Sequence, residues 1–259
     1  MDAKQTFEDL THRLQQFFKD AHSTQAVVAL SGGIDSALVV ALAVEALGAD
    51  QVRVVLLPSP FSSSHSVDDS VAMASKLNLH YDIVAIDDLY EVAMCKLRAI
   101  LPASDLGLAS ENIQSRLRCA LTMGVSNATG ALMLNTSNRS EILVGYGTLY
   151  GDTSGAVGVI ASLYKGEVYE LSRYINSVRG EVIPQNIIDK APSAELRDGQ
   201  LDSESLPDYE ILDAILRRLV DQGLSPETIA RDYPAATVER VVMLNRASAF
   251  KRLQLPPAL

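Results

Sequence analysis

A short apolar segment that runs into two glycines and then into a helical pattern constrains this chain more than any other feature. Residues 26–31 (AVVALS) are apolar and β-branched, which is typical of a strand buried on both faces. Gly32 and Gly33 interrupt the segment, and the run that starts at Asp35 predicts a helix that ends at Gly48. Strand, glycine turn and helix form the first half of a βα unit, so the sequence predicts a parallel sheet.

Strands and helical patterns continue to alternate along the rest of the chain. Further strands are predicted at 52–58, 80–86 and 131–135. Helical patterns are predicted within 1–20, in the stretch that follows SSSHSVDD (62–69) and ends at about residue 77, and at 164–178. Most of 89–123 is also predicted to be helical, with a break at 102–107, and two or three helices are predicted within 209–250. The glycine-rich segment 145–158 is predicted to form turns, and 189–207 a mobile loop that closes over the ligand. We therefore expect a doubly wound, mainly parallel α/β sheet with extra C-terminal helices, and a single domain over residues 1–259.

Composition excludes several classes of function. The chain has 32 acidic and 22 basic residues, and the formal charge of −10 argues against a nucleic-acid partner. No apolar run approaches the ~18 residues that a membrane span needs, so we expect no membrane partner and a cytoplasmic protein. Cys95 and Cys119 form no CxxC pair, which argues against a disulfide framework or a zinc site. Both fall on apolar helical faces and are predicted to be small core residues.

The segment SGGIDS (31–36) has the chemistry of a phosphate-binding loop. Its two glycines let the backbone turn and approach a ligand closely, and the helix that follows offers unpaired N–H groups and a positive dipole end to an anion. Ser31 and Ser36 add hydroxyl donors, and Asp35 would hold Mg²⁺ against the phosphate. The alternative is an ordinary βα turn in which Asp35 or Ser36 only caps the helix. Neither the GxGxxG nor the GxxxxGK[ST] pattern is present, so the nucleotide folds that carry them are not indicated.

SGGIDS resembles the pyrophosphate-binding loop of the N-type ATP pyrophosphatases, and the other motifs choose a family among them. They follow in the order found in NAD synthetases: ENIQSRLR (111–118), NTSNRSE (135–141), TLYGD (148–152), PSAEL (192–196) and LPDYEILDAIL (206–216). The resemblance covers nearly the whole chain and implies an adenine nucleotide alpha-hydrolase-like fold. It implies a ligase that makes NAD from deamido-NAD (nicotinic acid adenine dinucleotide), ATP and ammonia. The nicotinate carboxylate would be adenylated with release of pyrophosphate, and ammonia would then displace AMP.

The same resemblance implies roles for individual residues. ATP contacts are expected at Leu30, Ser31, Gly32, Gly33, Ile34, Asp35, Ser36, Thr136, Lys165 and Ser193. Deamido-NAD contacts are expected at Arg116, Leu149, Asp152, Phe250 and Lys251, with Arg118 as the alternative to Arg116. Asp35 and Glu141 would bind Mg²⁺, and Asp35 and Lys165 would be the catalytic residues. Without the resemblance, Lys165 reads as a surface lysine and Glu141 as a carboxylate in the first turn of a helix.

The motifs also bear on the nitrogen donor and on assembly. Leu149 stands where some stand-alone family members carry a lysine, and several motifs look more like the synthetase domain of two-domain, glutamine-dependent enzymes. Fewer than thirty residues precede the first strand, so we expect free ammonia, or ammonia from a separate glutaminase partner. The family implies a homodimer with deamido-NAD at the subunit boundary and the helix around Arg116 at the interface. The alternatives are a tRNA thiolase of the same superfamily and a non-catalytic nucleotide sensor.

Overall fold

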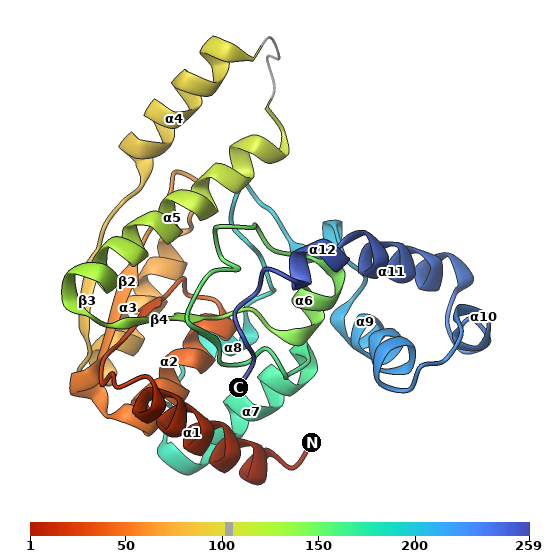
Figure 1. The fold of residues 1–259 in the computed structure, drawn as a ribbon, viewed down its shortest axis with the longest axis horizontal. Coiled ribbons are helices and arrows are strands. Elements are labelled where there is room, and N and C mark those ends of the chain that lie inside the picture. Colours follow the sequence, from red (N-terminus) through yellow and green to blue (C-terminus); the bar gives the residue numbers. More distant parts are fainter. Residues whose placement is uncertain (102–105) are drawn as a thin grey trace.

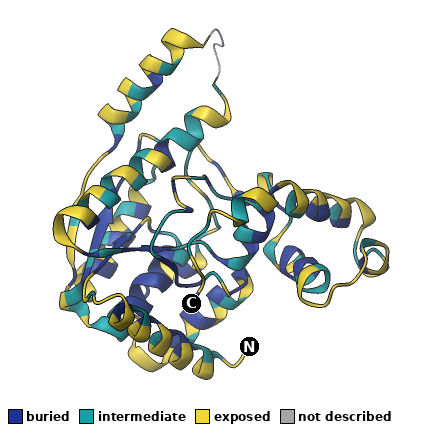
Figure 2. Ribbon diagram, in the orientation of Figure 1, coloured by how far each residue is buried: buried dark blue, intermediate teal, exposed yellow. Residues whose placement is uncertain are grey.

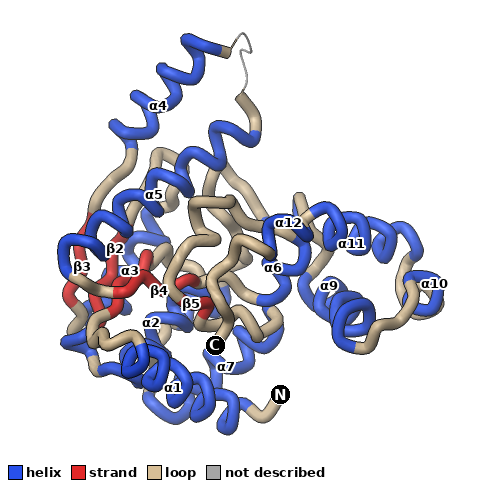
Figure 3. Tube along the Cα trace, in the orientation of Figure 1, coloured by secondary structure: helices blue, strands red, loops and turns tan. Residues whose placement is uncertain are grey.

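The computed structural model describes residues 1–101 and 106–259, so part of the break predicted at 102–107 lies outside the described residues. Within the described ranges, five parallel strands form one sheet in the order β3-β2-β1-β4-β5 (Figure 3). The strands are β1 (Ala26–Ala29), β2 (Val52–Leu56), β3 (His80–Ile83), β4 (Leu132–Asn135) and β5 (Val157–Gly158). The first four lie where they are predicted, and the parallel α/β fold is confirmed.

Helices cover both faces of the sheet, as a doubly wound fold requires. One face carries α1 (Ala3–Asp20), α2 (Ile34–Leu47), α3 (Ser64–Lys76) and α7 (Lys165–Arg179), and the other carries α5 (Leu108–Thr129) (Figure 1). Val28 and Val54 pack toward the first group of helices, whereas Val27 and Val55 pack toward α5, because successive side chains of a strand alternate in direction. Cys119 on α5 is half-buried against this second face. Burial on both faces explains why β1 is apolar throughout and why β2 is apolar apart from Arg53.

The helix after β1 begins and ends as the sequence predicts. α2 starts at Ile34, which puts Asp35 in its first turn, and most of its side chains are buried. Gly48, with φ +87°, ends the helix in a backbone conformation that favours glycine. The turn between β1 and α2 therefore lies at the carboxyl edge of the sheet.

The C-terminal helices form a second apolar cluster beside the sheet. They are α9 (Tyr209–Leu216), extended by a π-helical turn (Arg217–Asp221), α10 (Pro226–Ile229), α11 (Ala235–Ala247) and α12 (Ala249–Arg252). Leu212 and Val241 of this group belong to one buried cluster with Leu143 on α6 (Arg139–Val144), and Figure 1 shows α6 beside these helices. The helices predicted for the tail are confirmed. Their packing sets α9 against both α6 and α7.

The sequence does not predict α6, α8 (Gln185–Asp189) or β5. These elements are six residues long or shorter, too short to display a hydrophobic period. β5 pairs with β4 inside the glycine-rich segment, whose remainder forms turns as predicted. The segment 189–207 contains one 3₁₀ turn (Asp202–Glu204) and is otherwise irregular.

α4 (Asp87–Ile100) and the start of α5 form an arm that projects beyond the sheet (Figure 1) and is largely exposed (Figure 2). Val92, Ile100 and Leu108 are 60%, 76% and 71% exposed. The prediction that Cys95 is a core residue is wrong, because this arm leaves it exposed. Among the described residues, no helix has both the length and the apolar character that a membrane crossing demands.

Candidate functional site

A cavity of about 260 Å³ lies at the carboxyl end of the sheet, beside the turn that joins β1 to α2. Most of the expected ATP contacts line it, namely Leu30, Ser31, Gly33, Ile34, Asp35, Ser36, Thr136, Lys165 and Ser193. Glu141, the second expected Mg²⁺ ligand, lines it too, whereas Gly32 does not. The fold thus gathers these residues where open α/β sheets bind their ligands.

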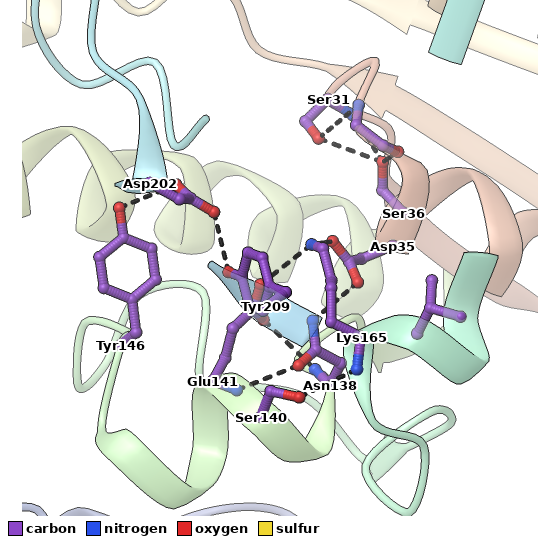
Figure 4. A network of polar contacts seen from close by, with 12 residues as sticks. Ser31, Asp35, Ser36, Asn138, Ser140, Glu141, Tyr146, Lys165, Asp202 and Tyr209 are labelled. Carbon is purple, nitrogen blue, oxygen red and sulfur yellow. Dashed lines mark hydrogen bonds and ion pairs between the residues drawn. The ribbon is translucent and has the colours of Figure 1, made fainter. Parts of the chain in front are cut away.

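The phosphate loop is shaped by its own serines. The Ser36 hydroxyl donates to the carbonyl oxygen of Gly33 (3.0 Å) and accepts from the backbone N–H of Ser31 (3.2 Å). The two serine hydroxyl oxygens lie 3.1 Å apart (Figure 4). No side chain of the described residues caps α2, so the alternative role of Asp35 or Ser36 as a simple cap is wrong. The first turn of α2 therefore offers backbone N–H groups and its positive dipole end to an anion in the cavity.

The two glycines of the loop serve different purposes. Gly32 has φ +78°, and a Cβ atom there would lie 2.3 Å from the backbone carbonyl oxygen of Ser66 on α3. Gly33 has φ −96°, and a Cβ atom there would meet only the Ser31 hydroxyl oxygen, at 3.5 Å. The fold therefore requires glycine at position 32, while the absence of a side chain at position 33 leaves room on the cavity side.

Lys165 lies between the two expected metal ligands. Its side chain is 3% exposed, and its Nζ is 2.5 Å from Asp35 Oδ2 and 3.5 Å from Glu141 Oε1 (Figure 4). Asn138 links the two carboxylates: its Nδ2 donates to Asp35 Oδ1 (2.9 Å), and its backbone N–H donates to Glu141 Oε2 (3.3 Å), while its Oδ1 accepts from the backbone N–H of Glu141 (3.0 Å). Lys165 is thus no surface lysine. Sequence reasoning missed Asn138, although the spacing of Asn138 and Glu141 is that of a capping box.

Burial and mutual charge perturb both ionisable partners. Burial lowers the pKa of Lys165, but Asp35 and Glu141 outweigh it and raise that pKa above its ordinary value. Burial, followed by the nearby Asp35, raises the pKa of Glu141 to about 8, although Lys165 opposes the rise. Lys165 is therefore charged at neutral pH, and Glu141 holds a proton when the cavity contains no other cation.

Glu141→Gln is expected to flatten the pH dependence of stability of the metal-free protein. The folded pKa of Glu141, about 8, lies above its ordinary value of 4.5, so the folded wild type binds an extra proton between these values. This contribution to the free energy of unfolding is complete below the lower pKa and is lost as pH rises through the upper one, by at most about 1.4 kcal/mol per pH unit. The glutamine variant lacks that loss, so it should gain on the wild type as pH rises.

Urea titrations at a series of pH values between about 5 and 9 measure this difference. Glu239→Gln, on an exposed face of α11, is the matched control and should follow the wild-type profile. Parallel wild-type and Glu141→Gln profiles would contradict the raised pKa.

The two carboxylates fit a hard divalent cation that is shared with a phosphate chain. Asp35 and Glu141 line the same cavity as the phosphate loop, and ionised carboxylates are oxygen acceptors of the kind Mg²⁺ prefers. Mg²⁺ is commonly held by one or two carboxylates together with substrate phosphates. The described residues hold no group of three or more His, Cys, Asp or Glu side chains able to bind a metal unaided. The donor set therefore suits Mg²⁺ that arrives with a nucleotide.

A buried carboxylate, Asp202, and one tyrosine, Tyr146, line the cavity, and a second tyrosine, Tyr209, contacts Asp202 and Lys165. Asp202 accepts hydrogen bonds from the hydroxyls of Tyr146 and Tyr209, each at 2.9 Å (Figure 4). The Lys165 Nζ lies 5.0 Å from the centroid of the Tyr209 ring, a cation–π contact. Sequence reasoning missed all three, since nothing in the pattern around Tyr209 indicates a partner at Asp202 or Tyr146.

The segment 189–207 is fastened to α3 in this structure. Lys190 Nζ contacts both Glu195 Oε1 (2.7 Å) and the Ser66 hydroxyl, and the Ser66 hydroxyl donates to Glu195 (2.7 Å). The Ser193 hydroxyl, an expected phosphate donor, instead donates to the carbonyl oxygen of Gln200 (2.6 Å). Ser193 therefore lines the cavity, but its hydroxyl hydrogen is engaged in a hydrogen bond inside the segment 189–207. Its role as an ATP contact stays a prediction.

Of the residues expected at deamido-NAD, Asp152 lines the cavity. Its Oδ1 accepts from the Ser115 hydroxyl (2.9 Å) and from the backbone N–H of Thr148 (2.7 Å). Arg118 also lines the cavity and donates through Nε to the carbonyl oxygen of Leu57 (2.8 Å). Of the two arginines, the structure therefore places Arg118, and not Arg116, at the cavity wall.

The other expected deamido-NAD contacts lie outside the cavity wall: Arg116, Leu149, Phe250 and Lys251. Arg116 Nε donates to the carbonyl oxygen of Leu149 (3.2 Å), and Lys251 Nζ donates to the carbonyl oxygens of Gly145 (2.8 Å) and Gly147 (2.7 Å). Phe250 is exposed. Arg116 and Lys251 thus hold the loop that leads to Asp152.

Known proteins resemble the chain over nearly its whole length. The family model described as NAD synthase matches residues 6–256. The glutamine-dependent NAD(+) synthetase of Synechocystis sp. is 40% identical over 260 residues, covering 100% of this chain and 46% of that protein. The solved structure of the NH3-dependent NAD synthetase of Campylobacter jejuni has a TM-score of 0.80 at 29% identity, covering 100% of this chain and 99% of that one. The NMN synthetase of Francisella tularensis has a TM-score of 0.83 at 27% identity, with 97% and 96% covered. The chain spans about half the length of the curated relatives it matches.

Proposed function

The chain belongs to the NAD synthase family, and we propose on that basis that it catalyses the ATP-dependent amidation of deamido-NAD to NAD. In the first step, a nicotinate carboxylate oxygen forms a bond to the α-phosphorus of ATP, and the bond from that phosphorus to the bridging oxygen breaks, so pyrophosphate leaves. In the second step, the nitrogen of ammonia forms the amide bond, the bond from the acyl carbon to AMP breaks, and the nitrogen loses a proton.

The observation that supports this reaction is the single cavity that joins the phosphate loop to Lys165, Asp35 and Glu141. N–H groups in the first turn of α2 would hold the leaving pyrophosphate. Lys165, buried and charged, would compensate the negative charge that develops around the α-phosphate. Asp35 and Glu141 would hold Mg²⁺, which, when bound, neutralises phosphate oxygens. Asn138 would hold Asp35 and the start of α6, which carries Glu141, at a fixed separation suited to binding the metal ion.

Ammonia is the proposed nitrogen donor for this chain. The matched relatives named as glutamine-dependent are about twice as long as residues 1–259, and the chain aligns with one half of them. The NH3-dependent neighbour, by contrast, is covered over 99% of its length. We therefore assign amidation to this segment, with ammonia taken up free or delivered by a glutaminase.

The test uses the purified chain with ATP, Mg²⁺ and ammonium chloride, and measures pyrophosphate and NAD with and without deamido-NAD. We expect pyrophosphate release that depends on deamido-NAD and matches the NAD formed. Glutamine in place of ammonium should give only background rates, and efficient use of glutamine would overturn the proposed donor. Release stimulated by tRNA alone would indicate a thiolase, and ATP binding without turnover would indicate a nucleotide sensor.

A mononucleotide acceptor is the second candidate. The fold match to an NMN synthetase favours it, as does the position of Arg116, Leu149 and Phe250 outside the cavity wall, since a mononucleotide would not need them. The same assay with the deamido form of NMN decides between the two. A higher kcat/KM for the mononucleotide than for deamido-NAD would establish this alternative.

We further propose a homodimer in which a second copy covers the arm formed by α4 and the start of α5. Val92 and Leu108 expose apolar surface there, and Arg116 lies farther along the same helix as Leu108. A partner on this face would complete the deamido-NAD site that a single chain leaves open around Leu149.

The double variant Val92→Glu/Leu108→Glu is expected to be a monomer, because each chain would bring two charges into the interface. Sedimentation velocity measures the change, and the KM for deamido-NAD should rise more than the KM for ATP. Met243→Glu, at a residue 60% exposed on α11, is the matched control and should leave the dimer intact. A double variant with the sedimentation coefficient of the wild type would exclude this face as the interface.

A further inference from the structure

A buried carboxylate that no step of the proposed reaction uses lies next to the backbone of Lys165. Asp213, on α9, is 7% exposed. Its Oδ2 accepts the backbone N–H of Gly166 at 2.9 Å, and its Oδ1 accepts the hydroxyl of Ser140. The Ser140 oxygen in turn accepts the backbone N–H of Lys165 at 2.9 Å. One carboxylate thus satisfies two consecutive N–H groups, one directly and one through a hydroxyl.

These two N–H groups are the first two of α7. A helix start leaves such groups unpaired unless a side chain accepts from them, and the usual acceptor stands at the N-cap position. The N-cap residue here is Tyr164, which makes no such hydrogen bond. Asp213, which lies on α9, acts as the cap of α7 instead, and its negative charge lies at the positive end of the α7 dipole.

The same hydrogen bonds connect the two elements that carry the reacting cluster. Ser140 precedes Glu141 on α6, and Lys165 is the first residue of α7. Fixing the Ser140 hydroxyl and the start of α7 to one carboxylate fixes the separation of Glu141 and Lys165. A Cβ atom at position 166 would lie 3.4 Å from Asp213 Oδ2, about van der Waals contact, so the carboxylate packs directly against the backbone of Gly166.

We propose that Asp213 is a positioning residue that sets the place of Lys165 relative to Asp35 and Glu141, and through it the rate of adenylation. The proposal rests on the proposed function for its effect on turnover. Displacements of about 1 Å at a reacting group can cost on the order of 100-fold in rate. The buried carboxylate accepts from two donors, and removing its charge weakens both hydrogen bonds.

Asp221 provides a matched control. Its carboxylate accepts from Arg139 on α6 (2.5 Å) and from the Tyr164 hydroxyl (2.9 Å), so it also ties α6 to the start of α7. It acts through side chains alone and does not contact the backbone of Lys165. If tethering of these helices in general were enough, Asp221→Asn and Asp213→Asn would have the same effect.

The kinetic experiment compares Asp213→Asn, Ser140→Ala, their combination and Asp221→Asn in the deamido-NAD-dependent pyrophosphate assay. Asp213→Asn and Ser140→Ala should each lower kcat by about 10- to 100-fold, with both KM values within about threefold of wild type. The double variant should be no worse than the more impaired single variant, because both changes break the same path. Asp221→Asn should keep kcat within about threefold. Wild-type kcat in folded Asp213→Asn, or an equal loss in Asp221→Asn, would overturn the proposal.

Amide hydrogen exchange tests the anchoring without relying on turnover. In Asp213→Asn, the amides of Lys165 and Gly166 should exchange at least about tenfold faster than in the wild type and in Asp221→Asn. Unchanged exchange would overturn the proposal even if activity fell. A wild-type chain that releases no pyrophosphate with deamido-NAD would refute the proposed function instead, and the exchange rates would still decide whether Asp213 holds the start of α7.

Discussion

Replacing Lys165 with methionine is expected to lower deamido-NAD-dependent pyrophosphate release by roughly 10³-fold, about 4 kcal/mol in activation free energy. Lys165 is the buried ammonium between Asp35 and Glu141, and its raised pKa keeps it charged at neutral pH. Methionine fills a similar volume but supplies no positive charge where two anionic substrates must meet. The KM for ATP should change less than kcat, because the charge is needed most when the α-phosphate is attacked.

Unfolding must be measured beside turnover for this variant. Loss of one partner from a buried ion pair costs about 3–5 kcal/mol of stability, so rates are compared only at temperatures where the variant is folded. Lys76→Met, which removes an exposed lysine paired with Glu181 at 3.7 Å, controls for the loss of a lysine as such. A folded Lys165→Met enzyme with turnover within about tenfold of wild type would contradict the assigned role.

The paired variants Gly32→Ala and Gly33→Ala are expected to separate folding from binding. In Gly32→Ala, the new Cβ atom lies 2.3 Å from the Ser66 carbonyl oxygen and the residue has φ +78°. Stability should fall by at least about 2 kcal/mol, because strain at positive φ and a clash with backbone add. In Gly33→Ala, stability should stay within about 1 kcal/mol of wild type, while ATP affinity falls about tenfold or more because the methyl group enters the cavity.

Thermal or urea unfolding measures the first property, and calorimetric titration with ATP and Mg²⁺ measures the second. Each variant serves as the control for the other, since they differ by one position in the same turn. Equal destabilisation by both would show that Gly33 is also a requirement of the fold. Unimpaired ATP binding by a folded Gly33→Ala protein would show that the phosphate chain of ATP does not bind next to position 33.

The parallel sheet could be predicted because β1 and β2 are largely buried on both faces, so β1 is apolar throughout and β2 is apolar apart from Arg53. The phosphate loop could be predicted because glycines, serines and a helix start are adjacent in sequence. Cys95 was misassigned because helical periodicity shows that one face is apolar, but not whether another element covers it. The two-residue strand β5 carries no periodic signal at all.

The side chains around Lys165 also divide into those that a local sequence pattern could have predicted and those that it could not. Asn138 stands three residues before Glu141, so a local capping rule could have found it. Asp202 lies 56 residues from Tyr146, and Asp213 lies 73 residues from Ser140. The first contact depends on how the segment 189–207 packs on the loop after α6, and the second on how α9 packs against α6, which no local pattern in the sequence records.

Ser66 serves two neighbours at once: its carbonyl oxygen restricts position 32 to glycine, and its hydroxyl binds Glu195 in the segment 189–207. Any residue at position 66 keeps the carbonyl oxygen, so the glycine requirement at position 32 persists whatever side chain stands there. A substitution at position 66 acts through the lost hydroxyl and therefore loosens the segment 189–207 without touching the phosphate loop. A change at position 195 should survive selection chiefly when position 66 or Lys190 has changed with it.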